Sequence, residues 1–190
     1  GEEGGTALAD ILFGKVSPSG KLPVTFPKSF DQLPPYEEYS MKGRTYRYME
    51  QEPLYPFGFG LTYSKFEFSA PLLSSTTLSA NGEVELSVSI ANRGEVASDE
   101  VVQLYVSPLG QLPNAPLYSL KGVRRIHLLP GEEVELTFPV NPTLLETVNE
   151  DGDLVLVKGK YRITVGTSLP TERSLQLGSN QYVYTEIEVV

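Results

Sequence analysis

Acidic side chains are the residues of this sequence with the clearest chemical potential. Glutamates form three adjacent pairs among them: Glu2-Glu3, Glu37-Glu38 and Glu132-Glu133. Hydrolysis of a glycosidic bond, for example, needs two carboxyl groups roughly 5–10 Å apart on either side of the bond. Adjacent residues in a helix or strand point in different directions, so no pair meets this need by sequence alone. We interpret the second and third pairs as solvated surface, whereas the glycines around Glu2-Glu3 allow close approach to the backbone.

Metal and nucleophile chemistry have weaker support. The single histidine, His127, lies in the alternating run Val123–Leu128 without an obvious serine or cysteine partner, so a structural role is favoured. One histidine and no cysteine cannot build a typical zinc site. Glu150, Asp151 and Asp153 lack the spacing of an EF-hand, and Asp151-Gly152 is better explained as a hairpin turn. Residues 1–5 lack the Lys-Ser/Thr ending of a phosphate loop. We therefore predict no metal site and no cofactor.

Guanidinium and phenol groups alternate in Gly43-Arg44-Thr45-Tyr46-Arg47-Tyr48, within a segment bounded by prolines. Such a loop can hydrogen-bond to a sugar and stack on it. It can equally pin the segment to a neighbouring domain, and this second role is favoured. We predict Glu3, Arg44 and Tyr46 as substrate-binding residues and no catalytic residue in the chain, and both roles of the loop stay open.

Composition limits the class of protein. A chain of 190 residues fits one domain, or one domain with an appendage, and 40% hydrophobic residues are enough for a core. The net charge of −9 argues against nucleic acid as a partner. No segment approaches the roughly 20 apolar residues that cross a bilayer, so no membrane partner is expected. Without cysteine there are no disulfides.

The first region, residues 1–63, contains a helix candidate over Glu3–Phe13. Ala7, Leu8, Ile11 and Leu12 form one apolar stripe on it. Residues 22–26 form a short extended run that contains a proline, so it is an edge strand or no strand. This region cannot bury the stripe itself, so we expect that a segment preceding Gly1 covers it. Residues 27–63 show no sustained period and are rich in tyrosine, which is typical of a functional segment or of one wrapped on another domain.

The second region, residues 64–190, alternates apolar and polar residues in seven or eight short runs with turns between them. This pattern predicts an antiparallel β-sandwich. The predicted strands lie at or near residues 66–69, 84–90, 102–106, 123–128, 134–140, 161–165 and 183–189, with a hairpin at 148–154.

Four collinear segments resemble the end of a glycoside hydrolase of family 3. The first runs from Glu2 to Gly14 and continues into Pro18–Phe26. The second is the Gly43–Tyr48 motif, joined to Leu54-Tyr55-Pro56-Phe57-Gly58-Phe59-Gly60-Leu61-Thr62-Tyr63. The third and fourth, Asp99–Val106 and Leu120–Leu128, resemble that family's fibronectin type III-like domain.

The resemblance implies a mainly β chain in three parts. Residues 1–26 would end a truncated α/β sandwich domain, residues 27–63 would be a connector, and residues 64–190 would be a fibronectin type III/immunoglobulin-like antiparallel β-sandwich. It also implies a retaining, exo-acting β-glycosidase, extracellular or periplasmic, whose nucleophile and acid/base lie upstream of the matching segments. The connector motif leans towards the β-xylosidase side of the family.

Three functions remain open. In the first, the chain is a non-catalytic part of a β-glucosidase or β-xylosidase. It braces the upstream catalytic domains and contacts oligo- or polysaccharide or a homodimer partner through the parent enzyme. In the second, the sandwich is a free-standing carbohydrate-binding or adhesion module that uses Tyr105, Tyr182 and Tyr184. In the third, the chain is a complete enzyme that uses Glu3 with Arg44 and Tyr46, and this has the least support because no acid pairs with Glu3 by spacing.

Overall fold

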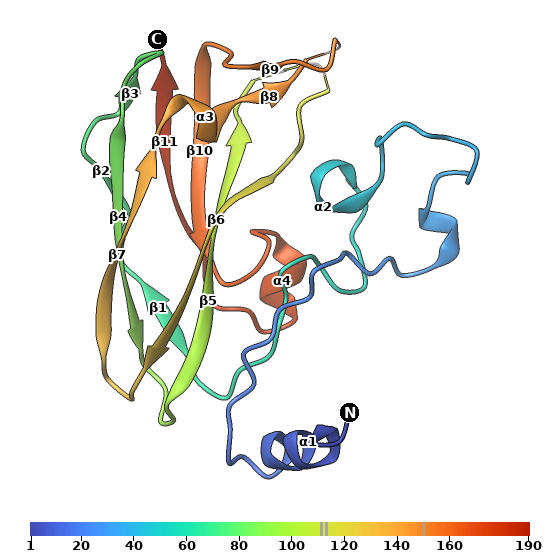
Figure 1. The fold of residues 1–190 in the computed structure, drawn as a ribbon, viewed down its shortest axis with the longest axis vertical. Coiled ribbons are helices and arrows are strands. Elements are labelled where there is room, and N and C mark those ends of the chain that lie inside the picture. The colour runs from blue at the N-terminus through green and yellow to red at the C-terminus, as the bar shows by residue number, and fades with distance from the viewer. Residues whose placement is uncertain (111, 113, 150) are drawn as a thin grey trace.

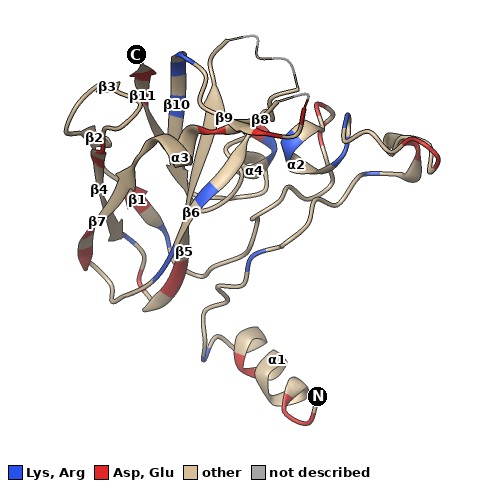
Figure 2. Cartoon of the chain, turned by 45° about the horizontal axis from the view of Figure 1, so that its top comes forward, with Lys and Arg blue, Asp and Glu red and all other residues tan. Residues whose placement is uncertain are grey.

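The computed structural model describes residues 1–110, 112, 114–149 and 151–190. A β-sandwich forms most of the molecule (Figure 1). An N-terminal arm, residues 1–63, starts at a helix below the sandwich, runs upward beside it, loops outward and returns to the first strand. Acidic and basic residues are interspersed along both parts (Figure 2).

The first sheet has four strands among the described residues, all antiparallel. The central strand, β4 (Val84–Asn92), is the longest of the four. It pairs with β7 along one edge, and its length leaves room for both β1 and β2 along the other. In this central strand, valines, leucine and isoleucine point into the core and alternate with Glu85, Ser87 and Ser89 on the other face. The strands are β1 (Phe66–Phe68), β2 (Leu72–Leu73), β4 (Val84–Asn92) and β7 (Glu133–Val140).

The second sheet has five strands in the part of the chain that the structure describes, in the order β3-β11-β10-β5-β6. The predicted antiparallel β-sandwich is confirmed: all pairs of this sheet are antiparallel except the two-residue pair of β3 with β11, which is parallel. A register shift interrupts the β5–β6 pairing between Leu104 and Tyr105. The strands are β3 (Thr77–Leu78), β5 (Ser98–Pro108), β6 (Ser119–Leu128), β10 (Gly159–Gly166) and β11 (Val183–Val189).

The core lies between the two sheets and is built from their inward-facing apolar side chains. Burying one valine, leucine, isoleucine or phenylalanine contributes about 1.5–3 kcal/mol, so this layer supplies most of the stability. Its members include Phe66, Leu78, Leu86, Ile90, Val102, Leu104, Phe138, Val140, Tyr161, Ile163 and Ile187.

Short elements complete the fold. The predicted hairpin around Asp151-Gly152 is confirmed: β8 (Thr147–Val148) pairs with β9 (Leu154–Val155). The amide groups of Asp151 and Asp153 donate to Asn149 Oδ1 across its turn. Among the described residues, the sandwich contains the short helices α3 (Pro142–Leu145) and α4 (Glu172–Gln176). The arm contains α1 (Gly4–Leu12), the 3-10 helix η1 (Phe30–Gln32) and α2 (Thr45–Tyr48).

Most long elements match the sequence prediction, and the helix predicted over Glu3–Phe13 is observed over Gly4–Leu12. The extended run at residues 22–26 is not a strand, and only Phe26 forms an isolated bridge, with Tyr55. The sequence reasoning missed β2, β3, α2 and α4. Two-residue strands give no measurable period, and single helical turns give no stripe.

Candidate functional site

The arm contacts the sandwich most closely through Pro56–Gly60. Gly58 has a φ of +73°, and a Cβ on it would overlap the side-chain oxygen of Gln103. A Cβ on Gly60 would likewise overlap the carbonyl of Gly20. Only glycine permits these approaches. Gly58 therefore lets this segment of the arm lie directly on β5, and Gly60 lets it lie against the earlier arm segment around Gly20.

Gln103 is the hydrogen-bonding centre of this contact and is buried. Its Nε2 donates to the carbonyl of Gly58 at 3.0 Å and to that of Thr167 at 3.1 Å. The hydroxyl of Tyr105 donates to its Oε1 at 2.5 Å. The tyrosine is itself fully buried, and burial raises its pKa. Tyr105 therefore cannot form part of an exposed aromatic platform, which corrects its place in the carbohydrate-module hypothesis.

A buried ion pair makes a second attachment. Lys21 Nζ lies 2.7 Å from Glu100 Oε1 on β5, and the Glu100 side chain is only 1% exposed. Glu100 Oε1 also accepts from the amide of Val101, whereas Oε2 has no partner among the described residues. Burial raises the pKa of Glu100, and the lysine opposes that shift.

Polar contacts close the two ends of the arm. Tyr63 donates its amide to Ser17 Oγ at 3.0 Å and its hydroxyl to the carbonyl of Ile11 at 2.8 Å. Ser98 Oγ donates to Ser17 Oγ at 2.8 Å, and Thr62 Oγ1 lies 3.3 Å from it. We call this group, formed by Ser17, Thr62, Tyr63 and Ser98, the Ser17 clasp.

The three residues predicted to bind substrate are not brought to one place. Glu3 precedes α1 at the far end of the arm, and its side chain makes no capping bond. Arg44 donates from its guanidinium to the carbonyls of Pro35, Glu38 and Ser40, so it fixes the shape of its own loop.

Tyr46 holds the arm against the sandwich. Its ring stacks on Phe57 with centroids 4.2 Å apart, and meets Tyr105 edge-on at 6.2 Å. Its hydroxyl accepts from the amide of Leu120 at 3.2 Å. These contacts support the pinning role for the Gly43–Tyr48 motif, and a sugar-binding role for Glu3, Arg44 and Tyr46 stays a prediction.

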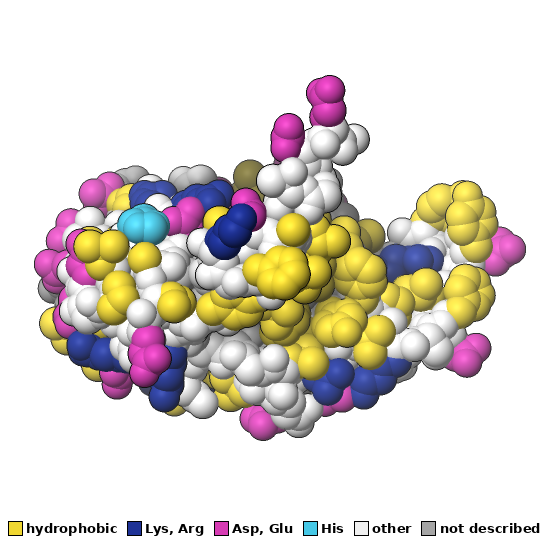
Figure 3. Space-filling view, turned by 90° about the horizontal axis from the view of Figure 1, so that it is seen from below, with side chains coloured by type: hydrophobic (Ala, Val, Ile, Leu, Met, Phe, Trp, Pro, Cys, Tyr) yellow, Lys and Arg dark blue, Asp and Glu magenta, His cyan; other side chains and the backbone are white. Residues whose placement is uncertain are grey.

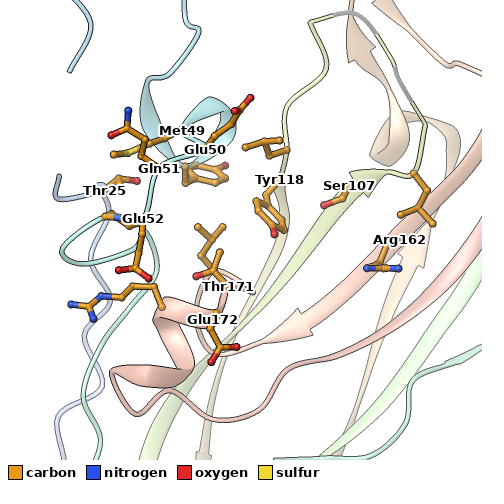
Figure 4. A pocket seen from close by; sticks show the side chains of 16 residues that line it. Thr25, Met49, Glu50, Gln51, Glu52, Ser107, Tyr118, Arg162, Thr171 and Glu172 are labelled. Atoms are coloured by element: carbon orange, nitrogen blue, oxygen red, sulfur yellow. The ribbon is translucent and has the colours of Figure 1, made fainter. Parts of the chain in front are cut away.

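A cleft of about 380 Å³ opens between the arm and the outer face of the second sheet. Tyr46, Thr25 and Gln51 line it from the arm, and Tyr118 and Arg162 line it from the sandwich. Arg162 faces outward because its neighbours Tyr161 and Ile163 point into the core. Figure 4 shows Thr25 and Gln51 opposite Tyr118 and Arg162, with Thr171 and Glu172 closing the space between them. The sequence reasoning found only Tyr46 of this set, since the others come from distant segments.

His127 lies away from this cleft, on the surface of β6. Its Nδ1 is 2.6 Å from Asp99 Oδ1, and Arg125 donates to the other oxygen of the same carboxylate. Hydrogen bonds from Arg125 and His127 hold the pKa of Asp99 below its usual value. Within the described ranges, no group of three or more His, Cys, Asp or Glu side chains could hold a metal ion. None of the helices described is long and apolar enough to cross a membrane.

The arm also carries a large uncovered apolar surface. None of the residues of α1 is buried, and Leu12 is 69% exposed. Phe13 is 84% exposed and Tyr39, in the outer loop, 88%. Hydrophobic side chains gather in a broad band over this part of the molecule (Figure 3). Exposure of Leu8 and Leu12 was expected from the sequence and is confirmed, whereas Ile11 is half-buried.

Comparison with known proteins matches both parts of the chain. Residues 1–63 match the glycosyl hydrolase family 3 C-terminal domain, and residues 100–169 match the fibronectin type III-like domain. A putative β-xylosidase of Formosa agariphila is 43% identical over 88% of this chain and 22% of its own length. A periplasmic β-glucosidase of Salmonella typhimurium is 38% identical over 87% of this chain and 23% of its own length.

A solved β-glucosidase structure from Erythrobacter marinus has the same fold. It superposes with a TM-score of 0.78 at 34% identity and covers 98% of this chain but 24% of its own. The chain thus spans about a quarter of the length of these relatives.

A family 3 C-terminal domain that leads into a fibronectin type III-like sandwich defines the class: the chain corresponds to a C-terminal portion of larger relatives. The chain belongs to glycoside hydrolase family 3.

Proposed function

We propose that this chain is the non-catalytic C-terminal portion of an exo-acting, retaining β-glucosidase or β-xylosidase, and that it braces the catalytic domains of that enzyme. The observation that carries the proposal is the uncovered face of α1. Leu8 and Leu12 form an apolar stripe of the kind that amphipathic helices pack against another surface. An exposed patch of this kind is typical of an interaction surface.

The chemistry of the acidic residues supports a non-catalytic role. A glycosidase acid/base needs a pKa raised towards the working pH while it faces the substrate. Glu52 lines the cleft, but a hydrogen bond from Lys28 holds its pKa below the usual value. Glu100 has a raised pKa, but it is buried against Lys21 and does not line the cleft. Neither Glu52 nor Glu100 combines a raised pKa with a position that faces the cleft.

The relatives support the substrate class and the location. One is named a putative β-xylosidase and another a periplasmic β-glucosidase, and each is more than four times the length of the matched segment. By this similarity, the parent enzyme of this chain cleaves β-linked glucose or xylose from oligo- or polysaccharide outside the cytoplasm. The division at residues 26 and 63 between α/β end, connector and sandwich is part of the same proposal.

Activity of the isolated chain tests the non-catalytic role. The purified 190-residue chain should not hydrolyse aryl β-glucoside or aryl β-xyloside above the rate of a mock purification. Turnover that follows the chain through a second purification step would show that catalytic carboxylates lie within it.

Assembly with the remainder of the parent enzyme tests the brace. We expect the separately produced upstream part to bind the chain and gain activity, and Leu12→Asp to abolish that gain. Leu129→Asp is the matched control, because Leu129 is 56% exposed and lies in the turn of the sandwich between β6 and β7. Equal loss with both variants would contradict a brace that acts through α1.

A second copy of this chain is the competing occupant of the arm surface. If arms pair with each other, sedimentation equilibrium will give a dimer whose dissociation constant rises with Leu12→Asp. A monomer that binds a hydrophobic dye is the result expected from the brace proposal.

A further inference from the structure

We propose that the cleft between the arm and the sandwich is a binding site for a neutral carbohydrate, one or two sugar rings of an oligosaccharide. The choice of sugar as the ligand class rests partly on the proposed function, since a β-glycosidase binds oligosaccharides as substrates or products. The geometry of the cleft, as distinct from its ligand class, does not depend on that function.

The size and position of the cleft fit a ligand site. Small-molecule sites are concave, measure about 300–1,000 Å³ and lie preferentially where two parts of a protein meet. This cleft has a volume of about 380 Å³ and lies where the arm meets the sandwich. The backbone of both walls is held by the hydrogen bonds of Tyr46 and Gln103, so the outline of the site is in place before a ligand arrives.

Aromatic surface is the first feature that suits a sugar. The ring of Tyr118 stands between the two walls in Figure 4. Burial raises the pKa of its hydroxyl, which makes no hydrogen bond to another described residue. An aromatic side chain with a polar tip can pack its face against the C–H groups of a sugar ring while its hydroxyl bonds to the edge.

Unpartnered polar atoms are the second feature. Thr25 Oγ1 on the arm and Arg162 Nε on β10 are both inaccessible, and neither has a hydrogen-bond partner among the described residues. Both residues line the cleft. Leaving a buried donor or acceptor without a partner costs about 1–3 kcal/mol. Because both atoms are closed off from solvent, a small rotation of each side chain is needed before a ligand hydroxyl, which can donate and accept, can bond to them.

The charges of the cleft favour a neutral ligand over an anion. Arg162 is held by an ion pair with Glu186 at 3.0 Å, and its guanidinium lies 4.4 Å from the ring centre of Tyr184. Arg173 donates to the carbonyl of Leu54. Both cations of the cleft are thus already engaged, while Glu50 and Glu172 also line it and would repel an anion.

Titration of the 190-residue chain with xylotriose and cellotriose, followed by amide and Arg Nε NMR shifts, tests this site. The anionic trimer of galacturonic acid is the charged comparison. We expect saturable shifts at Gln51, Tyr118 and Arg162 Nε with at least one neutral trimer. Tyr118→Ala should weaken binding about tenfold, and Thr25→Val roughly three- to tenfold.

Thr25→Val is the sharper variant, because it removes an unsatisfied hydroxyl and should leave the urea midpoint unchanged or higher. Tyr118→Phe, which keeps the ring, should bind more tightly than Tyr118→Ala. Tyr36→Ala removes an exposed tyrosine of the outer loop and should not change the affinity.

Three results would overturn the site: no saturable shift with either neutral trimer, affinity unaffected by both cleft variants, or tighter binding of the galacturonic acid trimer. These outcomes are separate from the brace, which is measured by assembly with the upstream part and by Leu12→Asp. Failure of sugar binding leaves the assembly result standing, and failure of assembly leaves the titration standing.

Discussion

The arm and the sandwich are built from similar apolar residues but use them differently. In the sandwich, every second residue of β4 is buried against the other sheet, and the core is complete within the chain. In the arm, α1 has an equally regular stripe and no buried residue. The arm is instead attached through glycine, one buried amide and one buried ion pair. A regular apolar pattern therefore indicates an element, but not whether the same chain covers it.

The largest expected difference between the two regions is in leucine truncation. Leu86→Ala in β4 should lower the free energy of unfolding by about 2–5 kcal/mol, because it opens a cavity at a fully buried site. Leu12→Ala in α1 should change it by less than about 0.5 kcal/mol. Urea unfolding of both variants measures the comparison. Equal losses would mean that α1 is packed in solution.

The ion pair between the regions comes next. Lys21→Met leaves the Glu100 carboxylate buried without its cation, which should cost roughly 1–3 kcal/mol. Replacing both partners, with Lys21→Met and Glu100→Leu together, should recover most of this loss, since a well-packed apolar pair often matches a buried ion pair. Urea midpoints of the three variants test it. A double variant as unstable as Lys21→Met would show that the lysine acts through packing alone.

The contributions of Asp99 and Glu100, neighbours on β5, to the free energy of unfolding should depend on pH in opposite directions. We expect this effect to be smaller than that of the ion pair. Burial raises the pKa of Glu100, so its contribution to stability is fully present below the usual glutamate pKa and is lost as pH rises through the raised value. Arg125 and His127 lower the pKa of Asp99, so its contribution is present above the usual aspartate pKa and is lost as pH falls through the lowered value.

We therefore expect Glu100→Gln to flatten the stability profile above the usual glutamate pKa of about 4.3, and Asp99→Asn to flatten it below the usual aspartate pKa of about 3.9. Urea midpoints at each pH give both profiles. A profile that Glu100→Gln leaves unchanged would argue against a raised pKa for this carboxyl.

The smallest expected effect is in the outer loop of the arm. Arg44→Lys replaces a planar fork that bonds to three carbonyls, and an ammonium group cannot match its geometry. The free energy of unfolding should change by only a few tenths of a kcal/mol, because the loop is exposed. Limited proteolysis around residues 35–40 should become faster. Lys42→Gln, an exposed neighbour, serves as the control, and equal cleavage rates in both variants would refute the role of the guanidinium.

Much of the sandwich can be predicted from sequence because its longer strands alternate apolar and polar residues, over seven positions in Val84–Ile90 and in Val134–Val140. The parallel pairing of β3 with β11 could not be predicted, since two residues at positions 77–78 carry no register information. The helix α1 was predictable from its stripe, but α2 begins at Thr45 with a φ of +53°, which no local propensity favours.

The candidate site was largely hidden from sequence reasoning for a topological reason. Thr25, Tyr118 and Arg162 are more than forty residues apart from one another and meet only because the arm lies along the second sheet. Tyr46 was found because it belongs to an aromatic motif. Arg44 was chosen for the same chemistry, and its guanidinium donates to backbone carbonyls of its own loop, which no sequence pattern indicated.

The Ser17 clasp joins the beginning and the end of a detour of more than forty residues, and Tyr63 ties that end to the last turn of α1. The angle between α1 and the sandwich is thus set by residues on either side of the detour and not by its length. Insertions or deletions between residues 27 and 43 can therefore accumulate during evolution without reorienting the sandwich, because lengthening a closed loop costs little. The outer loop is free to diversify while the two parts that it connects keep their alignment.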